Sequence, residues 1–150
     1  KNNIKVSFIG DINSFPENII KLIKKTIDST SANKSLNLNI ALGYSGRQEI
    51  LNTTKEIAHE VLNNRLNISN ISSNLFSSKL ENSYLGDPDL LIRTGGEYRV
   101  SDFLLWQIAY SEIYFTDKFW PDFNENEYLK AILNYQKRER RFGKISEQIN

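Results

Sequence analysis

The stretch that decides the fold reads Asp87-Pro88-Asp89-Leu90-Leu91-Ile92-Arg93-Thr94-Gly95-Gly96-Glu97-Tyr98-Arg99-Val100-Ser101-Asp102-Phe103. Its apolar run, residues 90–92, is bounded by turn residues, a pattern typical of a strand buried on both faces of a parallel sheet. Gly95 and Gly96 then allow the backbone to turn and to present its N–H groups. Ser101 is a good N-cap residue for an apolar helix that is expected to begin near Phe103. The stretch therefore predicts a strand, a glycine turn and a helix in succession.

The same stretch carries groups that bind phosphate in proteins. Arg93 stands at the end of the expected strand, and Arg99 and Ser101 follow the two glycines. A guanidinium binds phosphate through parallel hydrogen bonds, and a helix N-terminus also favours an anion. Because open α/β sheets bind ligands at the carboxyl ends of their strands, the stretch predicts an anion site. On composition alone, a structural arginine pair with surface carboxylates explains these residues equally well.

Apolar periodicity predicts the elements on either side of this stretch. Strands are expected at residues 4–10, 36–42 and 113–115, with helices at about 17–29, 47–62 and 125–135 and one or two short helices within 63–83. Ser14 and Glu17 have the spacing of a capping box for the first of these helices, and Asn124 and Glu127 for the last. The alternation of strands and helices predicts one α/β domain, residues 1–150, with a mostly parallel sheet flanked by helices.

Composition excludes several classes of protein. The 150 residues carry a net charge of +1, so no bulk attraction to nucleic acid or to an anionic membrane is expected. The chain has no cysteine, which excludes disulfides and thiolate metal sites, and a single histidine, His59. No transmembrane segment or signal peptide is apparent, so a cytoplasmic protein is expected. The chain begins with Lys1 and contains no methionine, which favours a piece of a longer protein.

A second turn, Gly43-Tyr44-Ser45-Gly46-Arg47, joins an expected strand to an expected helix. A serine in such a turn suggests the nucleophile of a hydrolase. The motif needs a glycine where Arg47 stands, and His59 lies inside the following helix, so Ser45 has no evident base. The sequence therefore disfavours a serine hydrolase.

The central stretch resembles the signature of the cis-prenyltransferase family, most closely its bacterial undecaprenyl diphosphate synthases. The shared pattern is Ile92-Arg93-Thr94-Gly95-Gly96-Glu97, Arg99, Ser101, Phe103-Leu104-Leu105-Trp106-Gln107, Glu112, Tyr114-Phe115 and Trp120-Pro121. The turn at residues 43–47 is similar to a second family motif, although Gly43 and Ser45 replace the usual asparagine and glycine. Asp102 also departs from the family, which usually has asparagine there.

The resemblance implies roles for six residues. Four are implied to bind the diphosphate of isopentenyl diphosphate: Arg93, Arg99, Val100 and Ser101. Glu112 is implied to help bind Mg²⁺, and Leu36 to lie near the floor of the tunnel for the growing prenyl chain. An ordinary core position remains the alternative for Leu36, and a surface glutamate before a strand remains the alternative for Glu112.

The implied reaction condenses isopentenyl diphosphate onto an allylic diphosphate, such as farnesyl diphosphate, and gives a long polyprenyl diphosphate. Undecaprenyl diphosphate, which feeds a cell-wall lipid carrier, is the product of the bacterial members. The resemblance also implies Mg²⁺ as cofactor and a homodimer. The aromatic residues between 110 and 123 are expected to contribute part of its interface. A basic run at residues 137–141, before Gly143, is read either as a solvated helix end or as a segment that reaches the partner's diphosphate.

The family's N-terminal motifs, which supply the catalytic aspartate, are not found in this sequence. The resemblance therefore covers the C-terminal portion of a cis-prenyltransferase domain that lacks its N-terminal strands, and the isolated chain is expected to be inactive. One alternative is a non-catalytic diphosphate-binding or partner subunit of a prenyltransferase. Another is a general phosphate- or nucleotide-binding α/β module, against which the chain has neither a P-loop lysine motif nor a dinucleotide glycine fingerprint.

Overall fold

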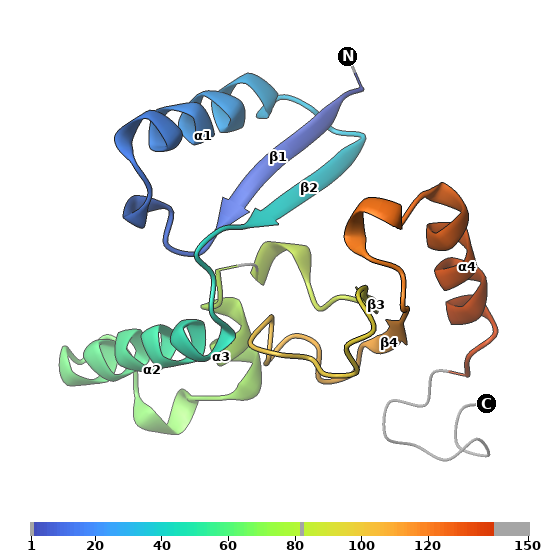
Figure 1. The fold of residues 1–150 in the computed structure, drawn as a ribbon. Helices are drawn as coiled ribbons and strands as arrows, with labels where there is room; N and C mark the ends of the chain where they lie inside the picture. Colours follow the sequence, from blue (N-terminus) through green and yellow to red (C-terminus); the bar gives the residue numbers. More distant parts are fainter. Residues whose placement is uncertain (1, 82, 140–150) are drawn as a thin grey trace. The chain divides into compact units, whose positions relative to one another are not determined.

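The structure, a computed structural model, describes residues 2–81 and 83–139 (Figure 1). The strands are β1 (Ile4–Ile9), β2 (Leu36–Ala41), β3 (Leu90–Arg93) and β4 (Glu112–Phe115). The α-helices are α1 (Glu17–Thr30), α2 (Gly46–Leu62), α3 (Ser73–Ser78) and α4 (Glu125–Gln136). Short 3-10 helices are η1 (Ile12–Ser14), η2 (Ile68–Asn70), η3 (Ser83–Leu85) and η4 (Trp120–Asp122). The chain forms two compact units, Lys1–Leu85 and Gly86–Asn150, and each is described by itself. The expected single domain stays a prediction.

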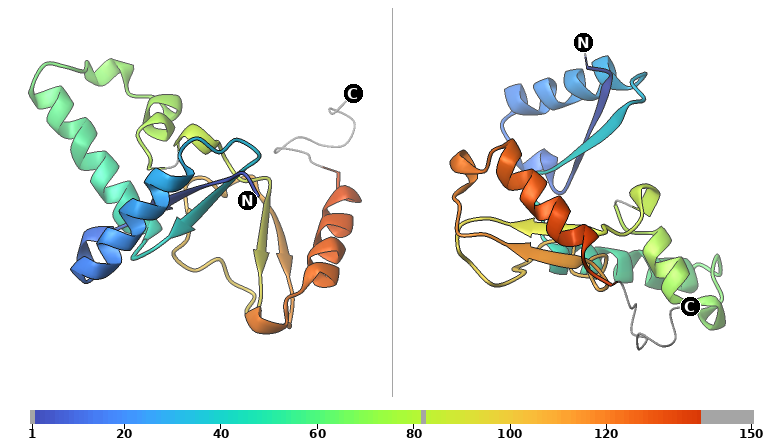
Figure 2. Two further views of the ribbon diagram at one scale, coloured as in Figure 1. Left: turned by 90° about the horizontal axis from the view of Figure 1, so that it is seen from above. Right: turned by 90° about the vertical axis from the view of Figure 1, so that its right-hand side faces the viewer.

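The first unit is built on a parallel pair of strands. β1 pairs with β2 so that Ile4 lies opposite Leu36 and Ile9 opposite Ala41. α1 runs alongside this pair and packs against β1 (Figures 1 and 2). Its residue Ile23 is only 4% exposed, so the isoleucines that repeat along α1 form its core-facing side.

The structure confirms the predicted N-cap of α4 but not that of α1. The predicted capping box of α1 is wrong: its N-cap is Pro16, and the Ser14 hydroxyl donates to the Asp11 carbonyl at 2.8 Å. The reason is that Ser14 already belongs to η1, where its side chain closes a turn of its own. At α4 the expected N-cap is confirmed, since Asn124 Oδ1 accepts from the N–H groups of Asn126 and Glu127 at 3.0 and 3.3 Å.

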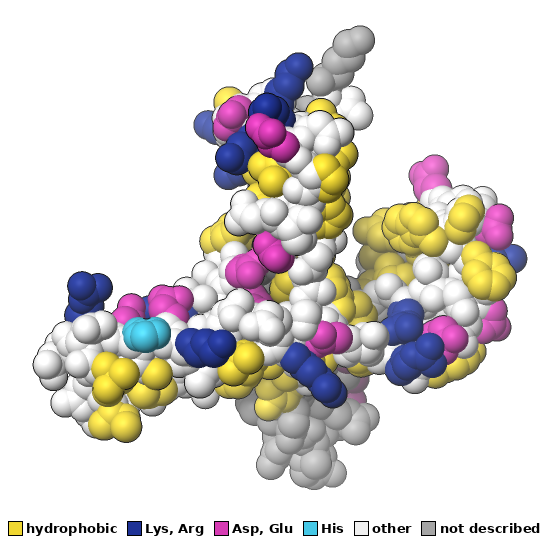
Figure 3. All heavy atoms as spheres, turned by 60° about the vertical axis from the view of Figure 1, so that its left-hand side comes forward, with side chains coloured by type: hydrophobic (Ala, Val, Ile, Leu, Met, Phe, Trp, Pro, Cys, Tyr) yellow, Lys and Arg dark blue, Asp and Glu magenta, His cyan; other side chains and the backbone are white. Residues whose placement is uncertain are grey.

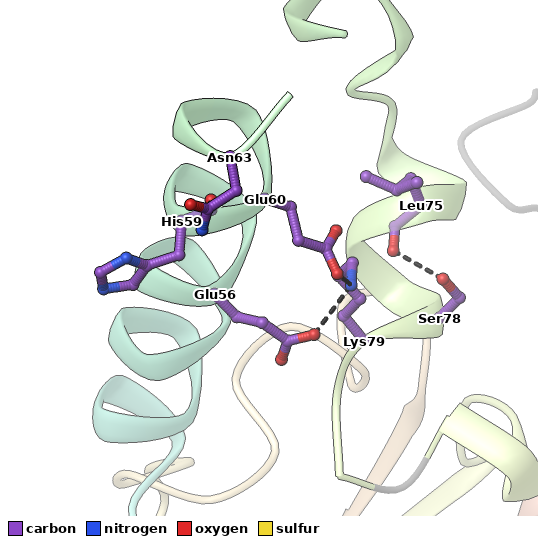
Figure 4. Close-up of polar contacts among 7 residues, drawn as sticks. All are labelled: Glu56, His59, Glu60, Asn63, Leu75, Ser78 and Lys79. Atoms are coloured by element: carbon purple, nitrogen blue, oxygen red, sulfur yellow. Dashed lines mark hydrogen bonds and ion pairs between the residues drawn. The ribbon is translucent and has the colours of Figure 1, made fainter. Parts of the chain in front are cut away.

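An ion-pair cluster holds α3 against α2 (Figure 4). Lys79 Nζ, just past α3, lies 2.8 Å from Glu56 Oε1 and 2.7 Å from Glu60 Oε1 on α2. Hydrogen bonds from Lys79 to these two carboxylates raise the pKa of Lys79 above its ordinary value. His59 lies on the same helix but points away from Lys79 (Figure 4).

The second unit is built on another parallel pair, so a fold based on parallel strands and flanking helices is confirmed. β3 pairs with β4 so that Leu90 lies opposite Glu112 and Arg93 opposite Phe115. α4 packs against β4, and its Ala131 is fully buried. All four residues of β3 are only half-buried, so the prediction of a strand buried on both faces is wrong. Among the described residues β3 has β4 as its one neighbouring strand, which leaves it partly open.

The helix expected from Phe103 does not form. Residues 102–110 are a run of bends and turns, in which the Leu104 carbonyl accepts from the Ile108 N–H at 3.0 Å. Ser101 and Leu104 have φ values of 64° and 46°, in the left-handed region that an α-helix excludes. Ser101 is therefore not an N-cap, and residues 102–110 do not present a helix N-terminus to the expected anion site.

The described helices and one face of the molecule bear on the expectations about membranes and charge. No helix within residues 2–81 and 83–139 combines the length and the hydropathy that crossing a bilayer requires. On the face drawn in Figure 3, cationic and anionic side chains are interspersed. Within the basic run, residues 140 and 141 and the expected stop at Gly143 lie outside the described residues.

Candidate functional site

A hollow at the carboxyl end of β3 collects three of the four predicted diphosphate-binding residues. Its volume is about 280 Å³, and it is lined by Leu91, Ile92, Arg93, Thr94, Val100, Ser101 and Phe103. Arg93 is half-buried at its edge, and no carboxylate of the described residues forms an ion pair with it. A half-buried guanidinium without an acidic partner is suited to bind an anion. The structure therefore brings Arg93, Val100 and Ser101 together around a space that a phosphate group can enter.

The glycine turn beside this hollow has the geometry that the sequence predicts, but not the expected free N–H groups. Gly95 and Gly96 have φ values of 90° and 72°. The Gly95 N–H donates to the Lys118 carbonyl at 2.8 Å, and the Gly96 N–H donates to the Thr116 carbonyl at 3.0 Å. The prediction that the turn presents free N–H groups is wrong at Gly95 and Gly96, because the segment after β4 supplies their acceptors.

Arg99 lies outside the hollow. Its side chain is 65% exposed and forms an ion pair with Glu97. Exposed ion pairs contribute little, so exchanging Glu97 for another anion has a small energetic cost. Arg93 is thus in place in this structure, whereas Arg99 stands nearby along the chain with its guanidinium paired to a carboxylate.

Glu112 occupies a different position from the arginines. It is the first residue of β4 and lies opposite Leu90, three register steps from the level of Arg93. That separation is about 10 Å along the strands, and side chains three positions apart project from opposite faces. The structure of one chain therefore does not bring Glu112 to the hollow that Arg93 lines.

Arg138 holds the Glu112 carboxylate. Arg138 Nη1 donates to Glu112 Oε2 at 2.8 Å, while Arg138 Nε and Nη2 donate to Asn134 Oδ1 at 3.0 and 2.7 Å. Glu112 Oε1 accepts no hydrogen bond from the described residues, so this oxygen suits a cation. Over residues 2–81 and 83–139, no group of three or more acidic, histidine or cysteine side chains could hold a metal ion. The described donor set thus fits Mg²⁺ only through one carboxylate, to which substrate phosphates and water must be added.

Leu36 is 56% exposed at the start of β2. The alternative that it fills an ordinary core position is therefore wrong for this structure. Leu38, two residues further along β2, is 45% exposed, so this part of the strand is open to solvent in the structure. Its tunnel role stays a prediction.

A second hollow lies at the carboxyl ends of β1 and β2, beside the turn at residues 43–47. Its volume is about 410 Å³, and its lining is Gly10, Asp11, Gly43, Tyr44, Ser45, Gln48, Glu49, Asn52 and Glu81. Glu49 is 4% exposed and accepts hydrogen bonds from the Tyr44 hydroxyl and the Glu81 N–H. The Glu81 carboxylate in turn accepts from the Gly10 N–H at 2.7 Å, a contact between residues 71 positions apart. Neither periodicity nor motif spacing in the sequence predicts a hydrogen bond between residues so far apart in the chain.

Ser45 has a structural role at this second hollow. Its hydroxyl caps α2 by accepting from the Gln48 N–H at 3.1 Å. His59 lies 14 residues further along the same helix, which places it about 20 Å from Ser45. The two cannot form a nucleophile–base pair, in agreement with the exclusion of a serine hydrolase.

Comparison with known proteins decides the family. The family model described as "Putative undecaprenyl diphosphate synthase" matches residues 1–143. The chain belongs to the cis-prenyltransferase family. It is 51% identical to an isoprenyl transferase of Prochlorococcus marinus subsp. pastoris over 99% of the chain. It is 46% identical to a tritrans,polycis-undecaprenyl-diphosphate synthase (geranylgeranyl-diphosphate specific) of Picrophilus torridus over 95% of the chain.

The fold is also that of a solved cis-prenyltransferase. The crystal structure of lavandulyl diphosphate synthase from Lavandula x intermedia, in complex with dimethylallyl diphosphate, matches 96% of the chain with a TM-score of 0.90 and 36% identity. The match covers 62% of that protein. The chain spans about half the length of the curated relatives it matches, namely 54% of the Prochlorococcus protein and 56% of the Picrophilus protein.

Proposed function

We propose that the protein carrying this chain is a cis-prenyl chain-elongating transferase. It condenses isopentenyl diphosphate units onto an allylic diphosphate, such as farnesyl diphosphate, and gives a long polyprenyl diphosphate such as undecaprenyl diphosphate. Membership of the family supports the reaction. The observation that carries the proposal for this chain is the hollow at the end of β3, where Arg93, Val100 and Ser101 meet.

In this proposal Arg93 binds the diphosphate of isopentenyl diphosphate and orients its double bond toward the allylic carbon. The Ser101 hydroxyl adds a hydrogen bond, and Val100 supplies an apolar wall. Arg99 exchanges Glu97 for the diphosphate, which its high exposure permits. During the reaction the allylic C–O bond breaks as the new C–C bond forms, a proton leaves to give a cis double bond, and diphosphate departs. The cationic side chains stabilise the charge that gathers on the diphosphate oxygens.

The proposed cofactor is Mg²⁺, with Glu112 as a ligand through its uncommitted oxygen. When bound, magnesium neutralises diphosphate oxygens and favours departure of the leaving group. Arg138 fixes the other oxygen of the same carboxylate, as outer-shell partners of metal ligands commonly do. The remaining carboxylate ligand and the catalytic aspartate are proposed to lie outside this sequence, so the isolated chain has no turnover in this proposal.

The proposed assembly is a homodimer in the cytoplasm. Large apolar side chains on the second unit support an interface there: Tyr110, Phe119 and Trp120 are 65%, 66% and 76% exposed. Aromatic residues are enriched in the buried centres of protein interfaces. Sedimentation of the natural protein tests this assembly, and a monomer at micromolar concentration contradicts it.

Calorimetric titration with isopentenyl diphosphate and Mg²⁺ tests the site. The natural-length protein is compared with Arg93→Ala and with Arg65→Ala, a matched control that removes an exposed arginine from the first unit. Binding is expected to disappear in Arg93→Ala and to persist in Arg65→Ala. Equal affinity in all three proteins would move the diphosphate elsewhere and contradict the proposed site.

A second candidate function is a non-catalytic diphosphate-binding or partner subunit. It is favoured by the ion pair between Glu112 and Arg138, which ties one oxygen of the proposed metal ligand to a guanidinium. Turnover of isopentenyl diphosphate with farnesyl diphosphate separates the two functions. Chain elongation by the natural-length protein supports the transferase, whereas tight binding of isopentenyl diphosphate without any product supports the subunit.

A further inference from the structure

The loop that follows β3, residues 94–101, is fastened to the segment that follows β4. The Thr116 N–H donates to the Arg93 carbonyl at 3.0 Å, which extends the pairing of the two strands by one residue. Beyond it, the carbonyls of Thr116 and Lys118 accept from the N–H groups of Gly96 and Gly95. The first half of the loop is thus held by backbone hydrogen bonds, which any sequence with these glycines can form.

The second half of the loop is held by side chains instead. The Tyr98 hydroxyl donates to Asp117 Oδ1 at 3.1 Å. The Tyr98 ring lies against the Phe115 ring, with centroids 5.3 Å apart and an interplanar angle of 47°, a geometry that favours aromatic pairs. The hydrogen bond to Asp117 and the charge of that carboxylate raise the pKa of Tyr98, so the hydroxyl stays a donor at physiological pH.

Gly96 lies beside Asp117 in the same loop. A Cβ at Gly96 would lie 3.4 Å from Asp117 Oδ1, the oxygen that accepts from Tyr98. A side chain at position 96 would therefore come into van der Waals contact with the carboxylate that binds the Tyr98 hydroxyl.

We infer that Tyr98 and Asp117 are a positioning pair for the diphosphate-binding residues of this loop. The inference rests on the proposed function. Tyr98 directly precedes Arg99, and Val100 and Ser101, which line the hollow, follow at once. Neither member of the pair lines the hollow itself, so the pair acts through the residues that it holds. The hydrogen bond to Asp117 and the ring contact with Phe115 hold Tyr98 against β4 and the segment after it. They thereby limit where Arg99, Val100 and Ser101 can lie.

A charge effect would act in the opposite direction. Asp117 is an anion near a site for diphosphate, so removing its charge would tighten binding if repulsion dominated. Asp117→Asn removes the charge but keeps an amide oxygen that accepts from Tyr98, whereas Asp117→Ala removes both. The two variants separate positioning from charge.

The test is titration of the natural-length protein with isopentenyl diphosphate in the presence of Mg²⁺. Tyr98→Phe and Asp117→Ala are each expected to raise the Kd about five- to tenfold, the effect of losing one exposed hydrogen bond of ordinary net strength. Asp117→Asn is expected to bind nearly as wild type, and the double variant Tyr98→Phe/Asp117→Ala no more weakly than either single variant. Tyr84→Phe is the matched control, because it removes an equally exposed hydroxyl that donates to Ser7 Oγ at 3.0 Å in the first unit.

Thermal unfolding of the same proteins identifies a general loss of structure. The unfolding midpoints of Tyr98→Phe and Tyr84→Phe are expected to agree, while only Tyr98→Phe weakens binding. Unchanged binding in Tyr98→Phe together with lost binding in Arg93→Ala overturns the positioning pair alone, as does tighter binding in both Asp117 variants. Unchanged binding in Arg93→Ala, or none in the wild type, overturns the proposed function and this inference with it.

Discussion

Arg138→Ala is expected to loosen the end of α4 from the start of β4. In the structure the guanidinium joins Glu112 to Asn134, with a 2.8 Å contact from Nη1 to the Glu112 carboxylate. The substitution leaves that carboxylate partly covered by protein and without its cationic donor. The loss falls on the second unit only, since both ends of the ion pair belong to it.

The magnitude follows from how far the pair is covered. The Arg138 and Glu112 side chains are 31% and 26% exposed, so the pair is neither a free surface pair nor a buried one. Exposed pairs contribute about 0.2–1 kcal/mol, and hydrogen bonds to charged groups about 1.5–3 kcal/mol when covered. We therefore expect Arg138→Ala to lower the free energy of unfolding by about 1–2 kcal/mol, which lowers the Tm of a chain of this size by about 2–8 °C.

Circular dichroism during heating measures the effect, with Lys130→Ala as the control. Lys130 lies on the same helix and pairs with Glu127, but its side chain is 61% exposed, so its removal is expected to change the Tm little. A double-mutant cycle with Glu112→Ala isolates the pair: the double variant is expected to be more stable than the sum of the two single losses implies. Equal Tm values for wild type and Arg138→Ala, or strictly additive losses, would refute the reasoning.

Two further changes test other parts of the structure. Gly96→Ala and Gly86→Ala place an L side chain at the same φ of 72°, so each is expected to lower the free energy of unfolding by about 1–2 kcal/mol in a urea titration. Only at Gly96 does the new Cβ meet Asp117, so weaker isopentenyl diphosphate binding is expected for Gly96→Ala alone, and equal binding in the two variants contradicts this. Lys79 stabilises the α2–α3 contact while it is protonated; since its pKa is raised above 10.5, this contribution is complete below pH 10.5 and is lost as the pH rises through the higher folded value. Thermal unfolding between pH 9 and pH 12 is expected to show a loss that Lys79→Met lacks, and identical pH profiles would exclude the ion pairs as its cause.

Apolar periodicity predicted the regular elements because each of them has one face that must be covered. The isoleucines of α1 repeat at helical spacing, and Ile23 among them is buried in the structure. The alternating apolar residues of β2 and the apolar run of β3 also became strands, although Leu36 and Leu38 of β2 are 56% and 45% exposed in the structure. In these segments the local pattern and the tertiary contacts favour the same conformation.

The segment after Ser101 shows where local pattern fails. A serine followed by Phe103, Leu104 and further apolar residues fits a capped helix, and nothing local distinguishes it from one. Left-handed φ values at Ser101 and Leu104 are rare for residues other than glycine, so propensity does not predict them. They persist only where the surrounding structure imposes them.

The polar contacts of the site were beyond prediction for a different reason. Glu112 meets Arg138 across 26 positions, and Tyr98 meets Asp117 across 19. Considered alone, each of these residues has the character of a surface residue. Its partner is determined only when the strands pair and bring distant parts of the chain together. The residue types around the hollow were predictable from motif chemistry, whereas the contacts that hold Arg99 and Glu112 were not.

The two parallel strand pairs also shape how the chain folds. Parallel pairing brings together residues that are far apart in sequence, Ile4 with Leu36 and Leu90 with Glu112, so a long loop must close before either pair gains a hydrogen bond. In the first loop, formation of α1 is a fast local step, and it shortens the flexible part of the loop that must close. The second loop, residues 94–111, contains only turns, and its left-handed residues are stable only after the strands are together. The β3–β4 pair closes the shorter of the two loops, but the left-handed residues of that loop are ordered only once the strands are together. The hollow that Val100 and Ser101 line is therefore expected to form after the β3–β4 pair and not before it.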